Sequence, residues 1–174
     1  ANTQKSLIRA GAGNYNTYHS WSVFVLPYIE QGNLALQYQY NQNWYASVNK
    51  SVVETPLPLM LCPAVPAGTS RVNTKSKGGI SFQLPTTDYS SNYSYLDRLA
   101  SGGLVDTVSN TNGLMPINYA VSPDEVKDGL SNTFLLCEDA GRPWLYEVRY
   151  AKSPTSQNDG GWADTDNNYI VHGS

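Results

Sequence analysis

The chain has 174 residues, a length that suits one domain able to bury a hydrophobic core without a metal or a disulfide. Its net charge is −3 and its 11 basic residues are scattered, which excludes the basic stripe of a nucleic-acid-binding protein. Charged residues make up only 14% of the chain, while 16 Asn, 18 Ser and 12 Thr carry most of its polarity. This composition is typical of extracellular or cell-surface proteins, so we expect that location.

The N-terminal third has helical spacing. Residues 1–18 mix helix formers with glycines and indicate a frayed helix end followed by a loop. From Trp21 to Tyr40, apolar residues recur at helical intervals, with interruptions at Pro27 and Gly32. Proline is favoured in the first turn of a helix. We therefore expect two short helices with a hinge near Gly32.

The middle of the chain indicates strands. Residues 48–63, "VNKSVVETPLPLMLCP", predict a strand with prolines at its entry or edge. Residues 64–87 are rich in Gly, Pro, Ser, Thr and Lys and predict an irregular surface loop. Residues 89–95 alternate Tyr with Ser and Asn, which is typical of a half-buried strand.

The second half predicts a capped turn and two strands. Residues 122–128 begin with Ser-Pro and carry Glu three residues after the Ser, the pattern of a short capped helix. Asp128-Gly129 predicts a turn into an apolar core strand at 133–137. A second strand follows at 144–150, connected through 138–143. Helices early and strands late indicate the α+β fold class.

The turn segment "DGLSNT" contains a candidate nucleophile, Ser131. It lacks the G-x-S-x-G pattern, and the only histidines, His19 and His172, lie far apart in sequence. We interpret this region as architecture, and we expect the protein not to be an enzyme. The residues of this structural signature are Asp128, Gly129, Ser131, Asn132, Thr133, Glu138 and Arg142.

Two adjacent acids, Glu138 and Asp139, could be taken for the carboxylate pair of a glycoside hydrolase. Adjacent residues on a strand point to opposite faces, so these two do not converge on one bond. One of them is better placed to pair with the guanidinium of Arg142. We expect Glu138 and Arg142 to clamp the turn between the two strands.

The segment "DGGWADTDNNY" resembles the beginning of a calcium loop. Alternate oxygens in a D-x-D-x-N pattern can face one ion, but Tyr169 stands where an EF-hand loop requires Gly. The interpretations left open are a calcium site of another type and a solvated Asx turn. The candidate calcium ligands are Asp159, Asp164, Asp166 and Asn168. No other cofactor is predicted.

The chain has two cysteines, Cys62 and Cys137, each at the end of an apolar run. They predict either two buried, inert thiols on neighbouring strands or, in an exported protein, one disulfide that closes a long loop. Zinc and haem sites are excluded because no Cys/His ligand spacing occurs.

Aromatic residues and sequons add one further function class. The 13 Tyr and 4 Trp would suit a glycan-binding surface if their ring faces are exposed. Asn-x-Ser sequons occur at Asn49 and Asn92 and matter only in a host that glycosylates such sites.

Five sequence blocks together resemble a large family of prepilin-like surface proteins abundant in planctomycetes, which look like type II secretion pseudopilins. In chain order the blocks are "HSWSVFVLPYIEQGNL", "VVETPLPLMLCPAVP", "DYSSNY", "VKDGLSNTFLLCEDAGRP" and "GGWADTDNNYIVHGS". Members of that family typically begin with a prepilin leader and a hydrophobic helix, and they continue past "HGS" into a segment with another Cys. This chain shows neither, so the resemblance implies trimming or processing at both ends.

The resemblance implies a pilin or pseudopilin-like head, in which an N-terminal helical segment packs on an antiparallel β-sheet with long irregular loops. Residues 1–18 would be a remnant of the stem helix or a linker, and residues 19–174 a single globular domain. Membrane contact would come only from the N-terminal helix that this chain lacks.

The predicted function is that of a non-enzymatic extracellular structural or assembly protein, a pilin-like subunit of a cell-surface filament or of a secretion-type pseudopilus. Its partners would be copies of itself or the envelope assembly machinery. The alternative is an extracellular ligand-binding module for a glycan or calcium, and a hydrolase comes third.

Overall fold

The computed structural model describes residues 17–65, 71–95, 98–107, 111–116, 121–146, 152–156 and 159–171. It confirms the α+β class, with short helices and small sheets. The helical elements are α1 (Trp21–Val25), η1 (Leu26–Tyr28), α2 (Gly32–Gln37), η2 (Ser47–Asn49), α3 (Lys50–Val53), η3 (Pro58–Met60), α4 (Arg98–Ser101), η4 (Pro123–Glu125) and η5 (Leu130–Asn132). The strands are β1 (Val72–Lys77), β2 (Ile80–Pro85), β3 (Tyr89–Tyr95), β4 (Leu136–Glu138), β5 (Trp144–Tyr146), β6 (Lys152–Ser156) and β7 (Asn168–Val171).

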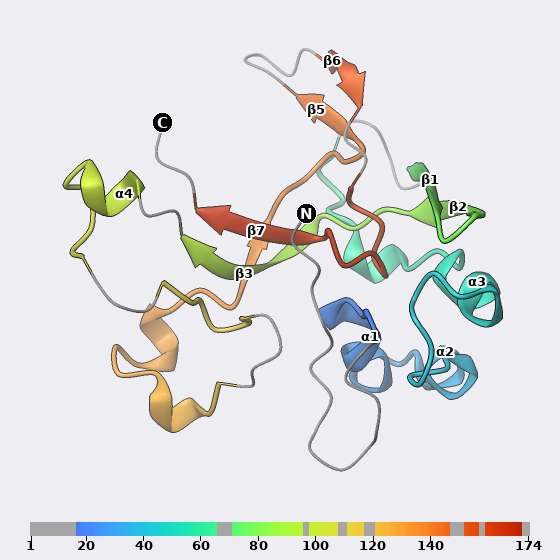
Figure 1. Ribbon diagram of the computed structural model, residues 1–174, viewed down its shortest axis with the longest axis horizontal. Helices are drawn as coiled ribbons and strands as arrows, with labels where there is room; N and C mark the ends of the chain where they lie inside the picture. Colours follow the sequence, from blue (N-terminus) through green and yellow to red (C-terminus); the bar gives the residue numbers. More distant parts are fainter. Residues whose placement is uncertain are drawn as a thin grey trace.

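Within the described ranges the strands form three small sheets. β1 and β2 make an antiparallel hairpin, β5 and β6 make another, and the third sheet has the order β4-β3-β7. In this third sheet β4 runs antiparallel to β3, but β7 runs parallel to it. Figure 1 shows β3 and β7 in the middle, the first three helices and the β1–β2 hairpin on one side, and α4 on the other. The sheet at the centre is therefore mixed, whereas the sequence predicted an antiparallel one.

The helices predicted between Trp21 and Tyr40 are confirmed. Pro27 lies in η1, directly after α1, and α2 begins at Gly32. In the part of the chain that is described, no helix combines the length and the apolar character needed to cross a membrane.

The strand predicted at residues 48–63 is wrong, because this segment forms η2, α3 and η3. Val52 and Val53 are buried side by side in α3, so burial outweighs their preference for strands. The side chain of Asn49 also fixes the turn: its Nδ2 donates to the carbonyl of Asn43 (3.0 Å), and its Oδ1 accepts from the amide of Gln39 (2.8 Å).

The loop predicted at residues 64–87 is also wrong for its second half, which forms the β1–β2 hairpin. The two-residue turn is Gly78-Gly79, and both glycines have positive φ. A Gly-Gly pair between two alternating segments is a hairpin signal. Phe82 and Leu84, on alternate positions of β2, are fully buried.

The hydrophobic core lies between the first helices, the hairpin and a tryptophan from far along the chain. The indole of Trp162 is fully buried and donates from Nε1 to the carbonyl of Thr55 (2.9 Å). The hydroxyl of Ser22 donates to the Trp162 carbonyl. The buried members of this cluster are Val23, Leu26, Tyr38, Trp44, Val52, Val53, Leu57, Met60, Phe82, Leu84, Trp162 and Ala163.

In the second half of the chain the predicted turns are present, but the predicted core strand is not. Glu125 Oε2 accepts from the amide of Ser122 (2.7 Å), as the capping box predicts. Gly129 has φ +84°, which allows the predicted turn. The predicted core strand at 133–137 is wrong: β4 starts only at Leu136, and the side chain of Phe134 is 75% exposed. The strand predicted from residue 144 is confirmed through Tyr146, whereas β6 and β7 were not predicted.

Candidate functional site

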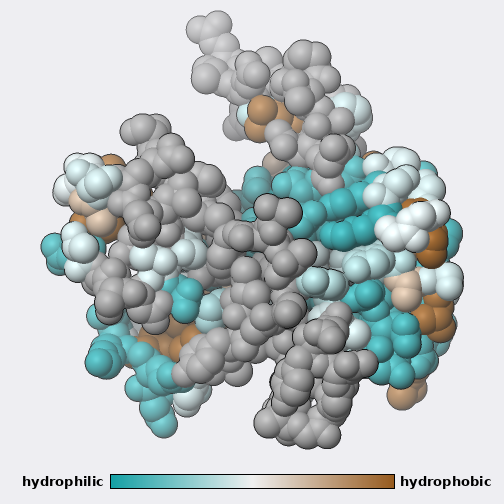
Figure 2. Space-filling model, in the orientation of Figure 1, coloured by the Kyte–Doolittle hydropathy of each residue, from teal (hydrophilic) through white to brown (hydrophobic). Residues whose placement is uncertain are grey.

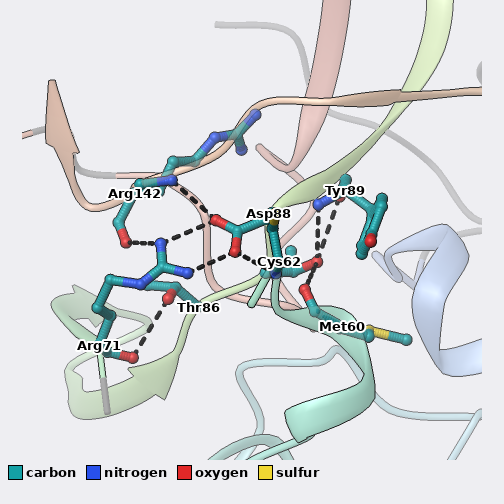
Figure 3. A network of polar contacts seen from close by, with 9 residues as sticks. Met60, Cys62, Arg71, Thr86, Asp88, Tyr89 and Arg142 are labelled. Carbon is teal, nitrogen blue, oxygen red and sulfur yellow. Dashed lines mark hydrogen bonds and ion pairs between the residues drawn. The ribbon is translucent and has the colours of Figure 1, made fainter. Parts of the chain in front are cut away.

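The carboxylate of Asp88 is the centre of a buried polar network (Figure 3). Asp88 lies between β2 and β3 and is fully buried. Its Oδ1 accepts from Nη1 of Arg71 (2.8 Å) and from the amide of Gly141 (2.8 Å). Its Oδ2 accepts from Nη2 of Arg71 and from the amide of Cys62 (2.7 Å). The two-pronged contact with Arg71 and the two amides give this buried charge four donors.

The network joins segments far apart in the chain. Arg71 also donates from Nη1 to the carbonyl of Arg142 (2.7 Å). The Asp88 amide donates to the Met60 carbonyl (2.9 Å), and the Asp88 carbonyl accepts from the Asp139 amide (2.7 Å). One aspartate therefore holds together the end of η3, the start of β1, and the turn between β4 and β5.

Arg142 forms a second layer of the same network, with its side chain directed away from Asp88 (Figure 3). Its Nε donates to Oδ2 of Asp139 (3.0 Å), and its Nη1 donates to Oδ1 of Asn167 (3.1 Å). Its Nη2 contacts Asp139 and the hydroxyl of Ser90. Arg142 is 4% exposed, and its guanidinium links the turn, β3 and the segment before β7.

The two glycines before Trp162 are required by close packing. A Cβ on Gly160, whose φ is +94°, would lie 2.6 Å from Cδ of Arg142. A Cβ on Gly161 would lie 2.8 Å from Cβ of Leu84. The sequence blocks "EDAGRP" and "GGWAD" therefore meet directly in space.

The prediction that Glu138 pairs with Arg142 is wrong, because the acid that contacts the Arg142 guanidinium is Asp139. Glu138 lies in β4 and its side chain points to the other side, toward the thiol of Cys62. β4 ends at Glu138, and the turn that follows brings Asp139 to the guanidinium three residues on. The turn after β4 thus decides which acid pairs with Arg142.

The rest of the predicted signature lies apart from this network. Asp128, Gly129, Ser131 and Asn132 are exposed, and Ser131 lies in η5. Asn132 Nδ2 donates to the Asp128 carbonyl (2.8 Å), and the Thr133 hydroxyl donates to the Gly129 carbonyl (3.1 Å). These contacts are local and hold a turn, as the sequence predicted.

Asp88, Arg71 and Lys75 were not among the residues predicted from the sequence. One signal was present: Asp88 is the only charged residue between Gly78 and Leu96. A lone charge within an apolar and hydroxyl-rich stretch indicates a buried, paired group, since unpaired charges are rarely buried.

A second ionic cluster contains the candidate calcium ligands. Nζ of Lys75, in β1, lies 2.5 Å from Oδ2 of Asp164 and 2.6 Å from Oδ2 of Asp166. Burial raises the pKa of Asp164, against the influence of Lys75, and the nearby Asp166 raises it further. Burial alone would lower the pKa of Lys75, but the two carboxylates raise it above its usual value. Burial thus dominates the pKa shift of Asp164, whereas the two neighbouring acids dominate that of Lys75.

The other two candidate ligands do not join this cluster. Asn168 Nδ2 donates to the Thr165 carbonyl (3.2 Å). Burial raises the pKa of Asp159, against the positive charge of Arg142, which lowers it. Among the described residues, no group of three or more His, Cys, Asp or Glu is arranged to hold a metal ion. The calcium site stays a prediction, and Lys75 already occupies the position next to both acids.

Calcium is expected to leave the melting temperature unchanged, because Nζ of Lys75 already lies against both Asp164 and Asp166, where the ion would have to bind. A calcium site saturated 100-fold would stabilise the fold by about 2.7 kcal/mol, which is roughly 5–10 °C for a domain of this size. Thermal unfolding in chelator and in millimolar calcium measures this. A rise of several degrees in the native protein, lost in Asp164→Asn, would establish the calcium site.

The two cysteines are free, half-buried thiols, so the alternative of a disulfide between them is not realised in this structure. Cys137 lies in β4 opposite Ser90, whereas Cys62 follows η3. The contact with Glu138 raises the pKa of the Cys62 thiol, and burial raises that of Cys137. Both thiols are thus kept in their less reactive, protonated form at neutral pH.

His19 is a structural histidine. It is 4% exposed, with Nδ1 2.7 Å from the hydroxyl of Tyr38 and Nε2 3.0 Å from the carbonyl of Tyr40. Because a carbonyl only accepts, Nε2 carries the proton and Nδ1 accepts from Tyr38. Ser131 does not contact His19, and His172 lies outside the described residues. No Ser-His pair is therefore formed by the described part of the chain.

The aromatic side chains offer little free surface for sugars. Trp44 and Trp162 are fully buried. The ammonium of Lys77 lies 5.4 Å from the centre of the Tyr45 ring, and Tyr18 stacks on the same ring at 6.3 Å. Among the aromatic side chains that the structure describes, Tyr28 and Phe134 are the well-exposed exceptions, at 83% and 75%. Of the two sequons, Asn49 is fully buried and hydrogen-bonded, so it is not an acceptor in the folded protein.

The geometry defines a small α+β protein whose buried charges are paired with one another. The chain matches the family described as "Protein of unknown function (DUF1559)" over residues 2–171, so it belongs to that family. No significant match was found among curated proteins or among solved structures.

Proposed function

We propose that this protein is a non-enzymatic structural or assembly protein of the cell surface, a pilin-like subunit of a filament or of a secretion-type pseudopilus. Its globular part would correspond to a pseudopilin-like head that contacts copies of itself or the envelope machinery. The observation that carries the proposal is the contrast between its buried charges and its exposed apolar side chains.

The charged side chains of the interior form ion pairs that stabilise the fold. Arg71 with Asp88, Arg142 with Asp139, and Lys75 with two aspartates form contacts between distant segments. An enzyme instead holds perturbed acids and bases at the wall of a cleft. The interior therefore supports an architectural role better than a hydrolase.

The exposed surface carries large apolar side chains on the segment that leads into β4. Leu130 is 59% exposed, Phe134 75% and Leu135 50%. Figure 2 shows small apolar patches on the left of the molecule, beside and below the position of α4, separate from the apolar atoms beside α2 and α3 on the right. β4 is also an outer strand of its sheet within the described residues. Apolar side chains beside a free strand edge suit contact with another subunit.

Phe134→Ser is expected to weaken self-association at least tenfold. Burial of a phenylalanine at an interface contributes about 1.5–3 kcal/mol, and about 1.4 kcal/mol corresponds to a factor of ten in the dissociation constant. Sedimentation velocity over a concentration series measures the change, and negative-stain microscopy shows whether ordered assemblies form.

The matched control is Tyr28→Ser, which removes an equally exposed ring from the other side of the molecule. It should leave self-association unchanged if the segment before β4 is the contact. A protein that stays monomeric at the highest attainable concentration and recruits no envelope partner would contradict the proposed function. A glycan-array signal lost in Tyr28→Ser would support the ligand-binding alternative instead.

A further inference from the structure

We propose that Lys75 and Asp164 become joined by an intramolecular isopeptide bond, with Asp166 as the group that transfers the proton. The three side chains form a compact triad: Nζ of Lys75 contacts Oδ2 of Asp164 at 2.5 Å and Oδ2 of Asp166 at 2.6 Å. The amine and the carboxyl that would react lie 89 positions apart in the sequence. The fold alone brings them together.

Burial favours the bond over an ion pair. The side chain of Lys75 is 15% exposed, and that of Asp164 is not exposed at all. Removing two opposite charges from water has a desolvation cost. Their mutual attraction offsets this cost only in part. An amide between the same atoms carries no charge. The fold also holds the two reacting groups in contact. The effective concentration of the amine at the carboxyl is therefore far above that of any free amine in solution.

Asp166 differs from Asp164 in a way that suits its role. Its side chain is 44% exposed, so its carboxylate touches both the lysine and solvent. It can therefore accept a proton from the lysine nitrogen and pass it to the departing oxygen, while the released water leaves outward. Asp164, fully enclosed, is the acid that becomes the amide.

The reaction balances without an oxidant or a cofactor. One proton moves from the ammonium of Lys75 to the carboxylate of Asp164, which gives a neutral amine and a carboxylic acid. The Nζ–Cγ bond forms, and Asp166 takes the second proton from nitrogen. The Cγ–O bond to the hydroxyl breaks as Asp166 returns that proton, so one amide and one water are produced.

The bond would tie strand β1 to the segment that precedes β7. β7 pairs with the central strand β3, so the cross-link would connect the hairpin covalently to the mixed sheet. Such a tie would suit a subunit that bears tension, but the chemistry rests on the triad and not on the proposed function.

The test is the intact mass of the denatured protein, measured after purification and again after prolonged incubation of the folded protein. We expect a mass lower than that of the sequence by one water molecule. After trypsin, the peptide 72–77 should be found linked to the peptide 153–174, with no cleavage after Lys75. A protein with the full sequence mass after incubation would overturn the proposal and leave a plain ion pair.

Three variants separate this bond from other losses of water, such as succinimide formation at an Asp-Gly pair. Lys75→Arg keeps the charge but cannot form the bond, so the full mass should return. Asp166→Asn keeps both reacting groups and should delay the loss of water. Lys50→Arg is the matched control, because Lys50 contacts Glu54 at the surface, and it should still show the loss. A loss of water that persists in Lys75→Arg would overturn the assignment.

Discussion

Replacing Asp88 by Asn is expected to lower the free energy of unfolding by about 3–5 kcal/mol, the cost of leaving one partner of a buried ion pair uncompensated. The guanidinium of Arg71 would keep its burial and lose its counter-charge. The new amide group would also face donors, since the amides of Cys62 and Gly141 both point at this carboxylate. Urea denaturation followed by circular dichroism measures the loss.

Two further variants make this prediction specific. Asp124→Asn removes an exposed acid from η4 and should change stability by no more than about 0.5 kcal/mol. Arg71→Met combined with Asp88→Asn removes the uncompensated charge and should recover part of the loss, with a coupling of about 0.5–3 kcal/mol. An Asp88→Asn protein as stable as the wild type would show that the network does not hold the fold together.

Acidification from pH 6.5 to 4 is expected to cost up to about 3 kcal/mol through His19 alone. Burial lowers the pKa of His19 from 6.5 to about 4, against the contact with the Tyr40 carbonyl, which raises it. Below pH 6.5 the unfolded chain takes up a proton that the folded chain does not. Stability therefore falls as the pH drops through this window and becomes level below about pH 4.

The difference in unfolding free energy between the wild type and His19→Gln, followed as a function of pH, isolates the contribution of His19. Glutamine can still donate to the Tyr40 carbonyl and accept from Tyr38, but it does not titrate. Asp159, whose pKa is raised by burial, contributes a slope of the opposite sign in both proteins. The urea midpoints of the wild type and of His19→Gln, measured at several pH values, should approach each other as the pH falls. Parallel curves would contradict the assignment of His19 as a neutral, buried histidine.

Local patterns were reliable where neighbouring residues decide the conformation. The capping box at Ser122 and Glu125, the turn at Gly129 and the helices around Pro27 all depend on contacts within a few residues. The same holds for β3, where the strand predicted at residues 89–95 is confirmed with the same bounds. These features could be predicted from the sequence because their causes lie in the sequence itself.

Predictions failed where contacts with residues far away in the sequence decide the conformation. Val52 and Val53 favour strands locally, but packing in the core places them in a helix. Phe134 is apolar yet exposed, because β4 begins two residues later at an outer position of its sheet. A single sequence does not show which apolar face the fold will cover.

The sequence by itself determined the α+β class, the low charge and the position of the main turns, since composition and short-range contacts carry this information. Only the tertiary structure decided that Asp88 meets Arg71, that Asp139 rather than Glu138 meets Arg142, and that Lys75 meets Asp164 and Asp166. The physical reason is that a charge is stable inside a protein only beside its partner. The partners here are 3 to 91 positions apart, at separations that the hydrophobic core sets.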